Sequence, residues 1–126
     1  MSTTRLRVGP RLSQAVIHGD TVYLTGCIAK QTKGGNVREQ TREILAMIDR
    51  LLAEAGSNKT KILSATIYLA DIATYTQLNA EWDAWVPEGH TPARATFEAK
   101  LPLAGTSVMI VVVAARDDLR TTPSPA

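Results

Sequence analysis

An apolar run near the C-terminal end, Ser107 to Ala115, constrains the fold more than any other segment. Alternate side chains of a β-strand point to opposite faces of a sheet, and both sets are apolar here. We therefore predict a central strand whose two faces are both covered. The stretch from Val108 to Ala115 is far too short to cross a bilayer, so this strand is assigned to a globular core.

Four further strands are predicted from β-branched residues, aromatic residues and alternation. Residues 15–18 and 21–25 flank Gly19-Asp20, a pair of the type that forms two-residue hairpin turns. Residues 62–70 alternate between apolar and polar side chains, as expected for a strand with one buried face. Residues 92–100 form the strand that precedes the C-terminal run.

Two amphipathic helices are predicted between these strands. The first begins at Asn36, with Glu39 three residues later as in a capping box, and ends at Gly56. The second begins at Thr74 and stops before Pro87. One stripe of this second helix is apolar and aromatic, and we expect its members to be core residues: Tyr75, Leu78, Trp82 and Trp85.

The predicted order, β-β-α-β-α-β-β, is that of an α+β domain with two helices packed on one sheet. We expect a single domain over residues 1–116 and a polar, proline-bearing tail over 117–126. Two helices leave the second face of the sheet uncovered. An oligomer is the economical way to cover it.

Composition narrows the choice of partner and compartment. The chain is 44% hydrophobic with a net charge of +2, and its basic residues are interleaved with acids. The absence of a basic stripe argues against nucleic acid as a partner. The N-terminus lacks the apolar stretch of a secretory signal, and the single cysteine, Cys27, fits a reducing compartment. We therefore expect a cytoplasmic protein with no membrane partner.

Several motifs in this order resemble the RidA (YjgF) family. A Thr-Gly pair follows the second predicted strand, and an aromatic helix contains the sequence NAEWDAW. The sequence TPARAT then precedes an LP-x-x-G turn and the final apolar strand. Alone, P-A-R is uninformative, but its position relative to the other motifs is specific. The residues that carry the resemblance are Thr25-Gly26, Asn79 to Trp85, Thr91 to Thr96, Leu101-Pro102 and Gly105.

The resemblance implies a chorismate-mutase-like fold, a homotrimer and three sites in the clefts between subunits. Archetypal members hydrolyse enamines and imines such as 2-aminoacrylate, giving a 2-oxo acid and ammonia. The family uses no metal or organic cofactor. On this basis we expect a deaminase of small 2-imino acids, such as 2-iminopropanoate.

The resemblance also indicates which residues form the site. Arg94 suits a carboxylate, because its guanidinium can hold both oxygens at once; the alternative is a surface ion pair. Strand alternation places Thr96 on the same face, at a position where the archetype has Cys, and we assign it a catalytic role with Arg94. Thr25 matches a pocket hydroxyl. Asn79 matches a helical amide near the site, although a surface or capping amide is equally consistent with the sequence.

Two expected polar groups are missing. Met109 stands where archetypal deaminases carry a Glu that positions water, and Leu12 stands where they carry a Tyr. Loss of an acid/base group typically costs about 10² to 10⁴ in rate. The alternative hypothesis is therefore a non-catalytic trimer that binds a small carboxylate. RNA cleavage, attached to some family members, is disfavoured by the near-neutral charge.

Three other residues are candidates for a catalytic role. Glu98 shares the face of Arg94 and either pairs with it or faces solvent. His90 has a pKa range suited to proton transfer, but a loop histidine without a partner is the favoured interpretation. Cys27 has no paired His, so a small buried residue is favoured over a nucleophile.

Overall fold

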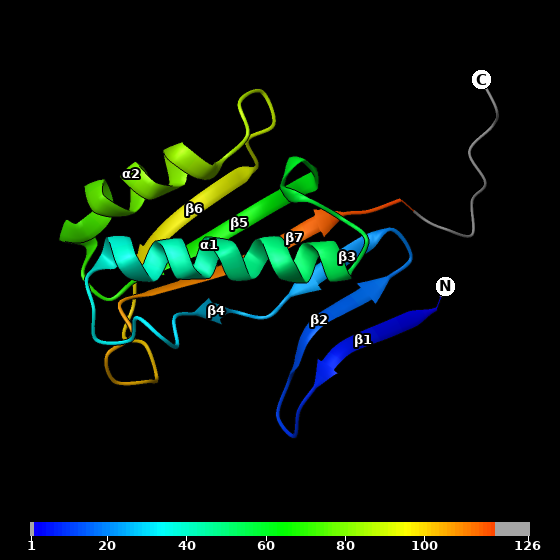
Figure 1. Cartoon of the computed structure of the whole chain (residues 1–126), viewed down its shortest axis with the longest axis horizontal. Helices are drawn as coiled ribbons and strands as arrows, with labels where there is room; N and C mark the ends of the chain where they lie inside the picture. Colours follow the sequence, from blue (N-terminus) through cyan, green and yellow to red (C-terminus); the bar gives the residue numbers. More distant parts are fainter. Residues whose placement is uncertain (1, 118–126) are drawn as a thin grey trace.

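The computed structural model describes residues 2–117 (Figure 1). The α-helices are α1 (Val37–Glu54) and α2 (Tyr75–Trp85), and 3₁₀ turns span Lys59–Lys61 and Ile72–Thr74. The strands, in chain order, are β1 (Thr3–Val8), β2 (Ser13–His18), β3 (Thr21–Leu24), β4 (Cys27–Ile28), β5 (Ile62–Leu69), β6 (Ala93–Glu98) and β7 (Val108–Ala115).

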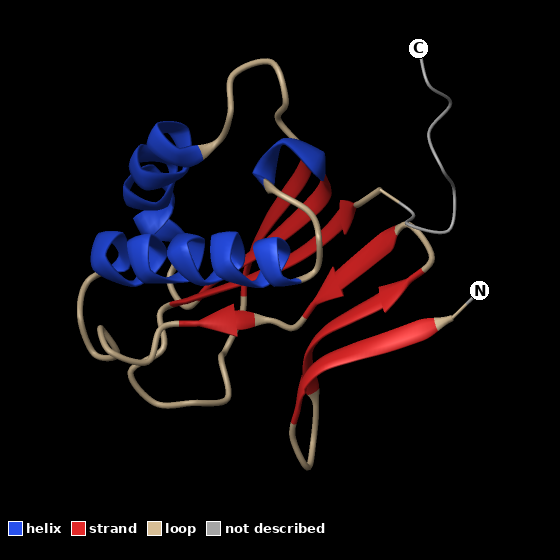
Figure 2. Ribbon diagram, turned by 45° about the vertical axis from the view of Figure 1, so that its right-hand side comes forward, coloured by secondary structure: helices blue, strands red, loops and turns tan. Residues whose placement is uncertain are grey.

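One mixed sheet organises the molecule, and both helices cover the same face of it (Figure 2). The strand order is β1-β2-β3-β7-β5-β6, and β4 also pairs with β7. The β5–β6 pair is parallel and the other pairs are antiparallel. The expected α+β arrangement of two helices on one sheet is therefore confirmed.

Strand β7 is central, as its apolar sequence predicts, with β3 and β4 on one side and β5 on the other. Its even-numbered residues, including Ile110 and Val112, are fully buried beneath the helices. Its odd-numbered residues, including Met109, Val111 and Val113, are only half-buried on the opposite face. That opposite face, which we call the bare face, has no covering layer among residues 2–117.

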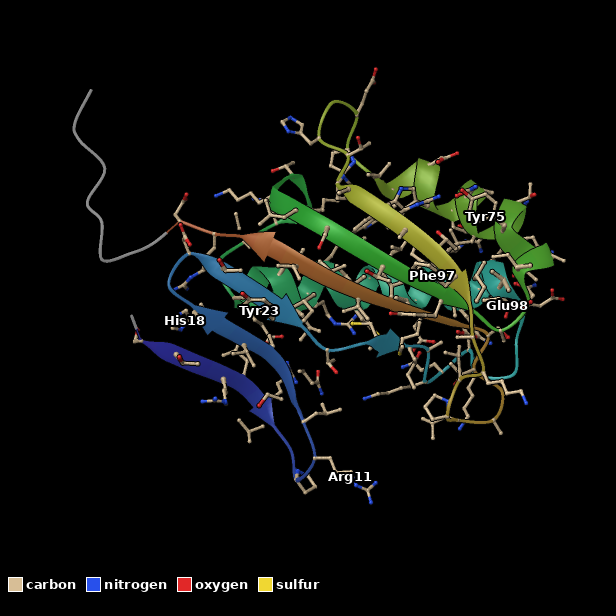
Figure 3. The ribbon with its side chains drawn as sticks, turned by 180° about the vertical axis from the view of Figure 1, so that it is seen from behind. Arg11, His18, Tyr23, Tyr75, Phe97 and Glu98 are labelled. Carbon is tan, nitrogen blue, oxygen red and sulfur yellow. The ribbon has the colours of Figure 1, made fainter. Side chains whose placement is uncertain are left out.

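The bare face remains apolar in its exposed parts. Tyr23 on β3 is 49% exposed and Phe97 on β6 is 53% exposed (Figure 3). The Phe97 ring lies 6.2 Å from the ring of Tyr68 on β5. An apolar surface that spans several strands indicates an interaction surface.

Local sequence signals account for the hairpin and for α1. Gly19 has φ 60° in the turn between β2 and β3, a value that suits glycine. The Asn36 side chain accepts a hydrogen bond of 2.9 Å from the Glu39 backbone N–H, as the capping box predicts. Gly56, with φ 80°, follows the end of the helix. These local predictions are confirmed.

Other predictions fail for identifiable reasons. β1 was not predicted, because it is an edge strand whose mostly exposed residues give no apolar alternation. The start of α2 is not capped by the Thr74 side chain. Asp71 instead caps a 3₁₀ turn that leads into the helix, accepting from the Ala73 N–H at 2.9 Å. Of the predicted tail, only Asp117 is described, in an ion pair with Lys61, and residues 118–126 lie outside the described range.

Candidate functional site

The edge strand β6 positions Arg94 and Thr96. In the parallel pairing with β5, Arg94 lies opposite Ala65 and Thr96 lies opposite Ile67. Both β5 residues are buried on the helix-covered side. Paired residues share a face of the sheet, so Arg94 and Thr96 point toward the helical layer. There they meet α2.

Two aromatic rings of α2 hold the Arg94 guanidinium. Its Nη2 donates a hydrogen bond of 2.9 Å to the Tyr75 hydroxyl. Its Cζ lies 5.7 Å from the centre of the Tyr75 ring and 5.3 Å from that of Trp82. Among residues 2–117, no carboxylate forms an ion pair with Arg94. The surface ion pair considered from the sequence is therefore not formed, and the cation is free to meet an anion from outside the chain.

Two buried polar atoms lie close to this arginine in the part of the chain that the structure describes. Asn79 Oδ1 and Thr96 Oγ1 are buried without a hydrogen bond from the described residues. Buried polar atoms are nearly always bonded, so unpartnered ones require an explanation, and a ligand supplies one. We call Tyr75, Asn79, Arg94 and Thr96 the Arg94 cluster. A shallow hollow of ≈ 340 Å³ opens over it, lined by Ile72, Tyr75, Arg94 and Thr96.

Tyr75 was expected in the core but is 41% exposed, because its ring packs against Arg94 rather than the sheet. Its contact with the Asn79 amide and the positive charge of Arg94 together lower the pKa of the Tyr75 hydroxyl. Sequence reasoning missed this residue as a site residue. The i, i+4 spacing from Asn79 is the signal that would have found it.

A second hollow contains Thr25 and Leu12. It lies between the β2–β4 segment and α1, has a volume of ≈ 210 Å³, and we call it the Thr25 hollow. Cys27 also lines it and is buried, as favoured from the sequence; burial raises the pKa of its thiol to about 11. A thiol with such a pKa is protonated and unreactive at neutral pH. The remaining walls are Gln14, Gly26, Ile28, Lys30, Met47 and Leu51.

One carboxylate braces the loop beside this hollow. Glu43 on α1 accepts hydrogen bonds from the backbone N–H groups of Lys30, Gln31 and Thr32, at 2.8, 3.1 and 2.8 Å. Partial burial opposes ionisation, but these bonds and one from the Thr32 hydroxyl outweigh it and lower the pKa of Glu43 to about 2.

Met109 lies on the bare face, where it pairs with Tyr68 and Ile28 and covers Gly26. A Cβ built on Gly26 would lie 2.7 Å from the Met109 sulfur. Strand alternation therefore places Met109 and Arg94 on opposite faces of the sheet. Within one chain, the predicted site residues are separated: Arg94, Thr96 and Asn79 lie together, Leu12 and Thr25 line the Thr25 hollow, and Met109 contacts Gly26 from the bare face.

The other acid/base candidates are engaged or distant. Glu98 Oε1 accepts the Ile72 N–H at 3.0 Å, so Glu98 fastens the 3₁₀ turn before α2 instead of pairing with Arg94 (Figure 3). His90 is exposed in the loop before β6, where its backbone N–H donates to Pro87. Within residues 2–117, no group of three His, Cys, Asp or Glu side chains gathers to hold a metal.

Fold and side-chain geometry together define a small sheet-and-helix protein in which an arginine at the sheet edge lies against two aromatic rings of a helix. Residues 3–116 match the family model described as endoribonuclease L-PSP. The chain therefore belongs to this family, which includes the proteins called YjgF or RidA. No helix formed by the described residues combines the length and apolar character needed to cross a membrane.

Individual relatives span nearly the whole chain. A RutC family protein of Haemophilus influenzae is 46% identical over 114 residues, which is 90% of this chain and 98% of that protein. A crystal structure of a YjgF family member from Neisseria meningitidis is 41% identical and superposes with a TM-score of 0.90, covering 94% of this chain and 98% of the other. A 2-iminobutanoate/2-iminopropanoate deaminase of Bos taurus is 30% identical over 119 residues, which covers 90% of this chain and 85% of that protein.

Proposed function

We propose that this protein is a cytoplasmic, homotrimeric hydrolase that converts small 2-imino acids to 2-oxo acids and ammonia. The observation that carries the proposal is the Arg94 guanidinium, which lies against two aromatic rings, has no carboxylate partner among residues 2–117, and is close to two polar atoms that lack a partner in the same range. This arrangement suits a small planar carboxylate.

The chemistry follows from that anchor. Two parallel hydrogen bonds from Arg94 would fix the substrate carboxylate and so orient the adjacent imine carbon for attack by water. Asn79 Oδ1 is an acceptor suited to an imine N–H, and Thr96 Oγ1 can bond either the ligand or the water. Water is the only co-substrate, and the reaction needs no metal or organic cofactor.

Assembly would complete the site. The bare face supports association with other copies, because Tyr23 and Phe97 expose apolar surface there. The Arg94 cluster and the Thr25 hollow are separate in one chain. In a closed ring of three subunits, the Arg94 cluster of one subunit would meet the Thr25 hollow of its neighbour, giving three equivalent clefts.

The bovine relative bears the name of a deaminase, and this supports the reaction class. The runner-up function is a non-catalytic trimer that binds a small carboxylate. Two observations favour it: Met109 offers no proton, and Glu98 is occupied by the Ile72 N–H. Both hypotheses use Arg94, and they differ only in turnover.

A coupled assay tests the proposal. Threonine dehydratase turning over threonine releases an imine, and 2-oxobutyrate formation is followed with and without the protein while semicarbazide competes. We expect faster release that Arg94→Ala abolishes and that Arg38→Ala, a matched change on the exposed side of α1, leaves unchanged. Saturable 2-oxobutyrate binding without any acceleration would support the binding protein instead.

A further inference from the structure

We propose that Tyr75 is the proton-transfer residue of this site, its hydroxyl delivering a proton to the nitrogen of the bound imine. The inference rests on the proposed imine hydrolysis and adds a catalytic residue to it. The geometry that carries it is the contact between the Tyr75 hydroxyl and Arg94 Nη2, which are 2.9 Å apart. Both residues line the shallow hollow over the Arg94 cluster.

The hollow leaves few alternatives for the proton donor. Of the four residues that line it, only Tyr75 has an acidic group whose usual pKa lies between neutral pH and the pKa of arginine. Glu98 shares the strand face but bonds the Ile72 N–H. Met109 lies on the other face of the sheet.

The hydrogen bond between Arg94 and Tyr75 has a useful direction. The guanidinium has donors only, so the phenolic oxygen accepts and the phenolic hydrogen is left to point elsewhere. Arg94 carries five N–H groups, and one bond to Tyr75 leaves enough of them to hold a carboxylate by two. One arginine can therefore orient both the substrate and its proton donor. With 41% of Tyr75 exposed, the ring edge is open to the hollow.

The reaction balances with this single group. As water attacks, a C–O bond forms and the C=N π electrons move to nitrogen, which takes the Tyr75 proton. The phenolate then recovers a proton from the added water, giving a neutral carbinolamine. In the second step the hydroxyl loses its proton as C=O forms, the C–N bond breaks, and the nitrogen leaves as ammonia with a proton relayed through Tyr75.

The neighbours of the Tyr75 hydroxyl favour this role. A hydrogen bond from Asn79 and the positive charge of Arg94 lower the pKa of Tyr75, and desolvation and the Asp83 carboxylate on α2 oppose this without reversing it. A phenol with a lowered pKa is a better acid, and it is still protonated at neutral pH. Catalysis by the neutral phenol should be lost as pH rises through that lowered pKa, below the usual value of about 10 for tyrosine.

The test compares Tyr75→Phe with Thr76→Val, which also removes a hydroxyl from an exposed position of α2 but takes no part in the Arg94 cluster. Three quantities are measured for each: the rate on 2-iminobutanoate made in situ, the pH profile of kcat/KM, and 2-oxobutyrate binding by calorimetry. We expect Tyr75→Phe to lower the rate by about 10² to 10⁴ and to remove the alkaline limb of the profile. Binding should remain within a few-fold, and Thr76→Val should behave as the wild type.

Each contrary outcome has a distinct meaning. An inactive wild type would overturn the proposed hydrolysis and this role with it. An active wild type whose Tyr75→Phe variant retains its rate would overturn the role of Tyr75 alone. Equal losses in rate and in 2-oxobutyrate binding would make Tyr75 a positioning residue for Arg94 and would overturn proton transfer.

Discussion

The Arg94 cluster and the Thr25 hollow differ in polarity more than in size. The cluster presents a guanidinium, a phenol and two unpartnered polar atoms. The hollow has apolar walls from Leu12, Met47 and Leu51, and its thiol is inert. If both form one cleft, recognition and proton transfer must come from the cluster, while the hollow supplies shape and excludes water.

The two regions also differ in how they are held. Arg94 is positioned by an edge strand and by two rings of a short helix. The hollow is braced by a loop whose backbone N–H groups converge on one carboxylate, Glu43. Substitutions that act on one region should therefore leave the other intact, and four experiments exploit this.

The largest effect should come from mixing subunits. Arg94→Ala removes one half of the proposed cleft and Thr25→Trp fills the other, so each variant alone should be inactive. Co-expressed, they should recover about a quarter of wild-type turnover, because random assembly joins two intact halves at about one interface in four. Turnover is measured in the coupled dehydratase assay.

Separately purified variants, mixed without subunit exchange, provide the control. No recovery in verified mixed oligomers would contradict a site shared between subunits, and an active Thr25→Trp variant would remove the hollow from the site.

A charge on the bare face should dissociate the subunits and so separate the Arg94 cluster of one from the Thr25 hollow of its neighbour. Phe97→Asp would bury an unpaired carboxylate at the proposed interface, at a cost of several kcal/mol, roughly the penalty for an uncompensated polar or charged group. We expect light scattering to shift from three times the 13.6 kDa chain mass to a smaller species, with turnover falling at least about tenfold. The circular dichroism spectrum should persist, since Phe97 is 53% exposed in the single chain.

Ala53→Asp, on the exposed side of α1, is the matched control and should keep the wild-type mass. If Phe97→Asp remained an active oligomer of unchanged mass, the bare face would not be the interface.

An acid added beside the hollow should narrow the difference in polarity. Met109→Glu places a carboxylate next to Gly26, where it can position water for attack. We expect kcat to rise by about tenfold, a modest share of what a positioned acid/base group supplies. Met109→Gln, similar in size but without the charge, should give no increase, and an equal gain from both variants would point to pocket shape instead.

The smallest effect should come from Glu43→Gln. The amide keeps one acceptor but loses charge-assisted bonds to the 30–32 loop, and we expect about 1 kcal/mol of destabilisation at pH 7. The folded pKa of Glu43, about 2, is below its unfolded value, so its stabilisation is complete above about pH 4.5 and fades as pH falls toward 2.

Urea unfolding of the wild type and the Gln variant at pH 7 and pH 3 measures this difference. If the difference in unfolding free energy between wild type and variant were larger at pH 3 than at pH 7, the predicted pH dependence would be wrong. Hydrogen exchange in the variant should be faster in the 30–32 loop but unchanged around Arg94.

Local sequence signals predicted much of the fold. The apolar run of β7, the Gly19 turn and the Asn36 cap each act within a few residues, so periodicity and capping rules were sufficient. The Thr74–Gln77 pair fits the same capping pattern as Asn36–Glu39, yet Asp71 takes the capping role because a 3₁₀ turn precedes the helix. Choosing between two nearby capping residues requires the path of the incoming chain.

The candidate site was less accessible to sequence reasoning. Arg94 and Asn79 were found through motifs, whereas Tyr75 was assigned to the core by its helical spacing. Spacing shows which side chains share a helix face, but not that the edge of this face meets an arginine 19 residues further along the chain. The engagement of Glu98 by the Ile72 N–H depends equally on tertiary contacts.

The contact between Met109 and Gly26 restricts the order in which substitutions can accumulate. The Met109 side chain occupies the space that any side chain at position 26 would need, 2.7 Å from a Cβ there. A side chain at position 26 therefore requires the Met109 side chain to move away or position 109 to become smaller. The residues at these two positions compete for one space, so substitutions in the turn and in β7 should be coupled and not independent.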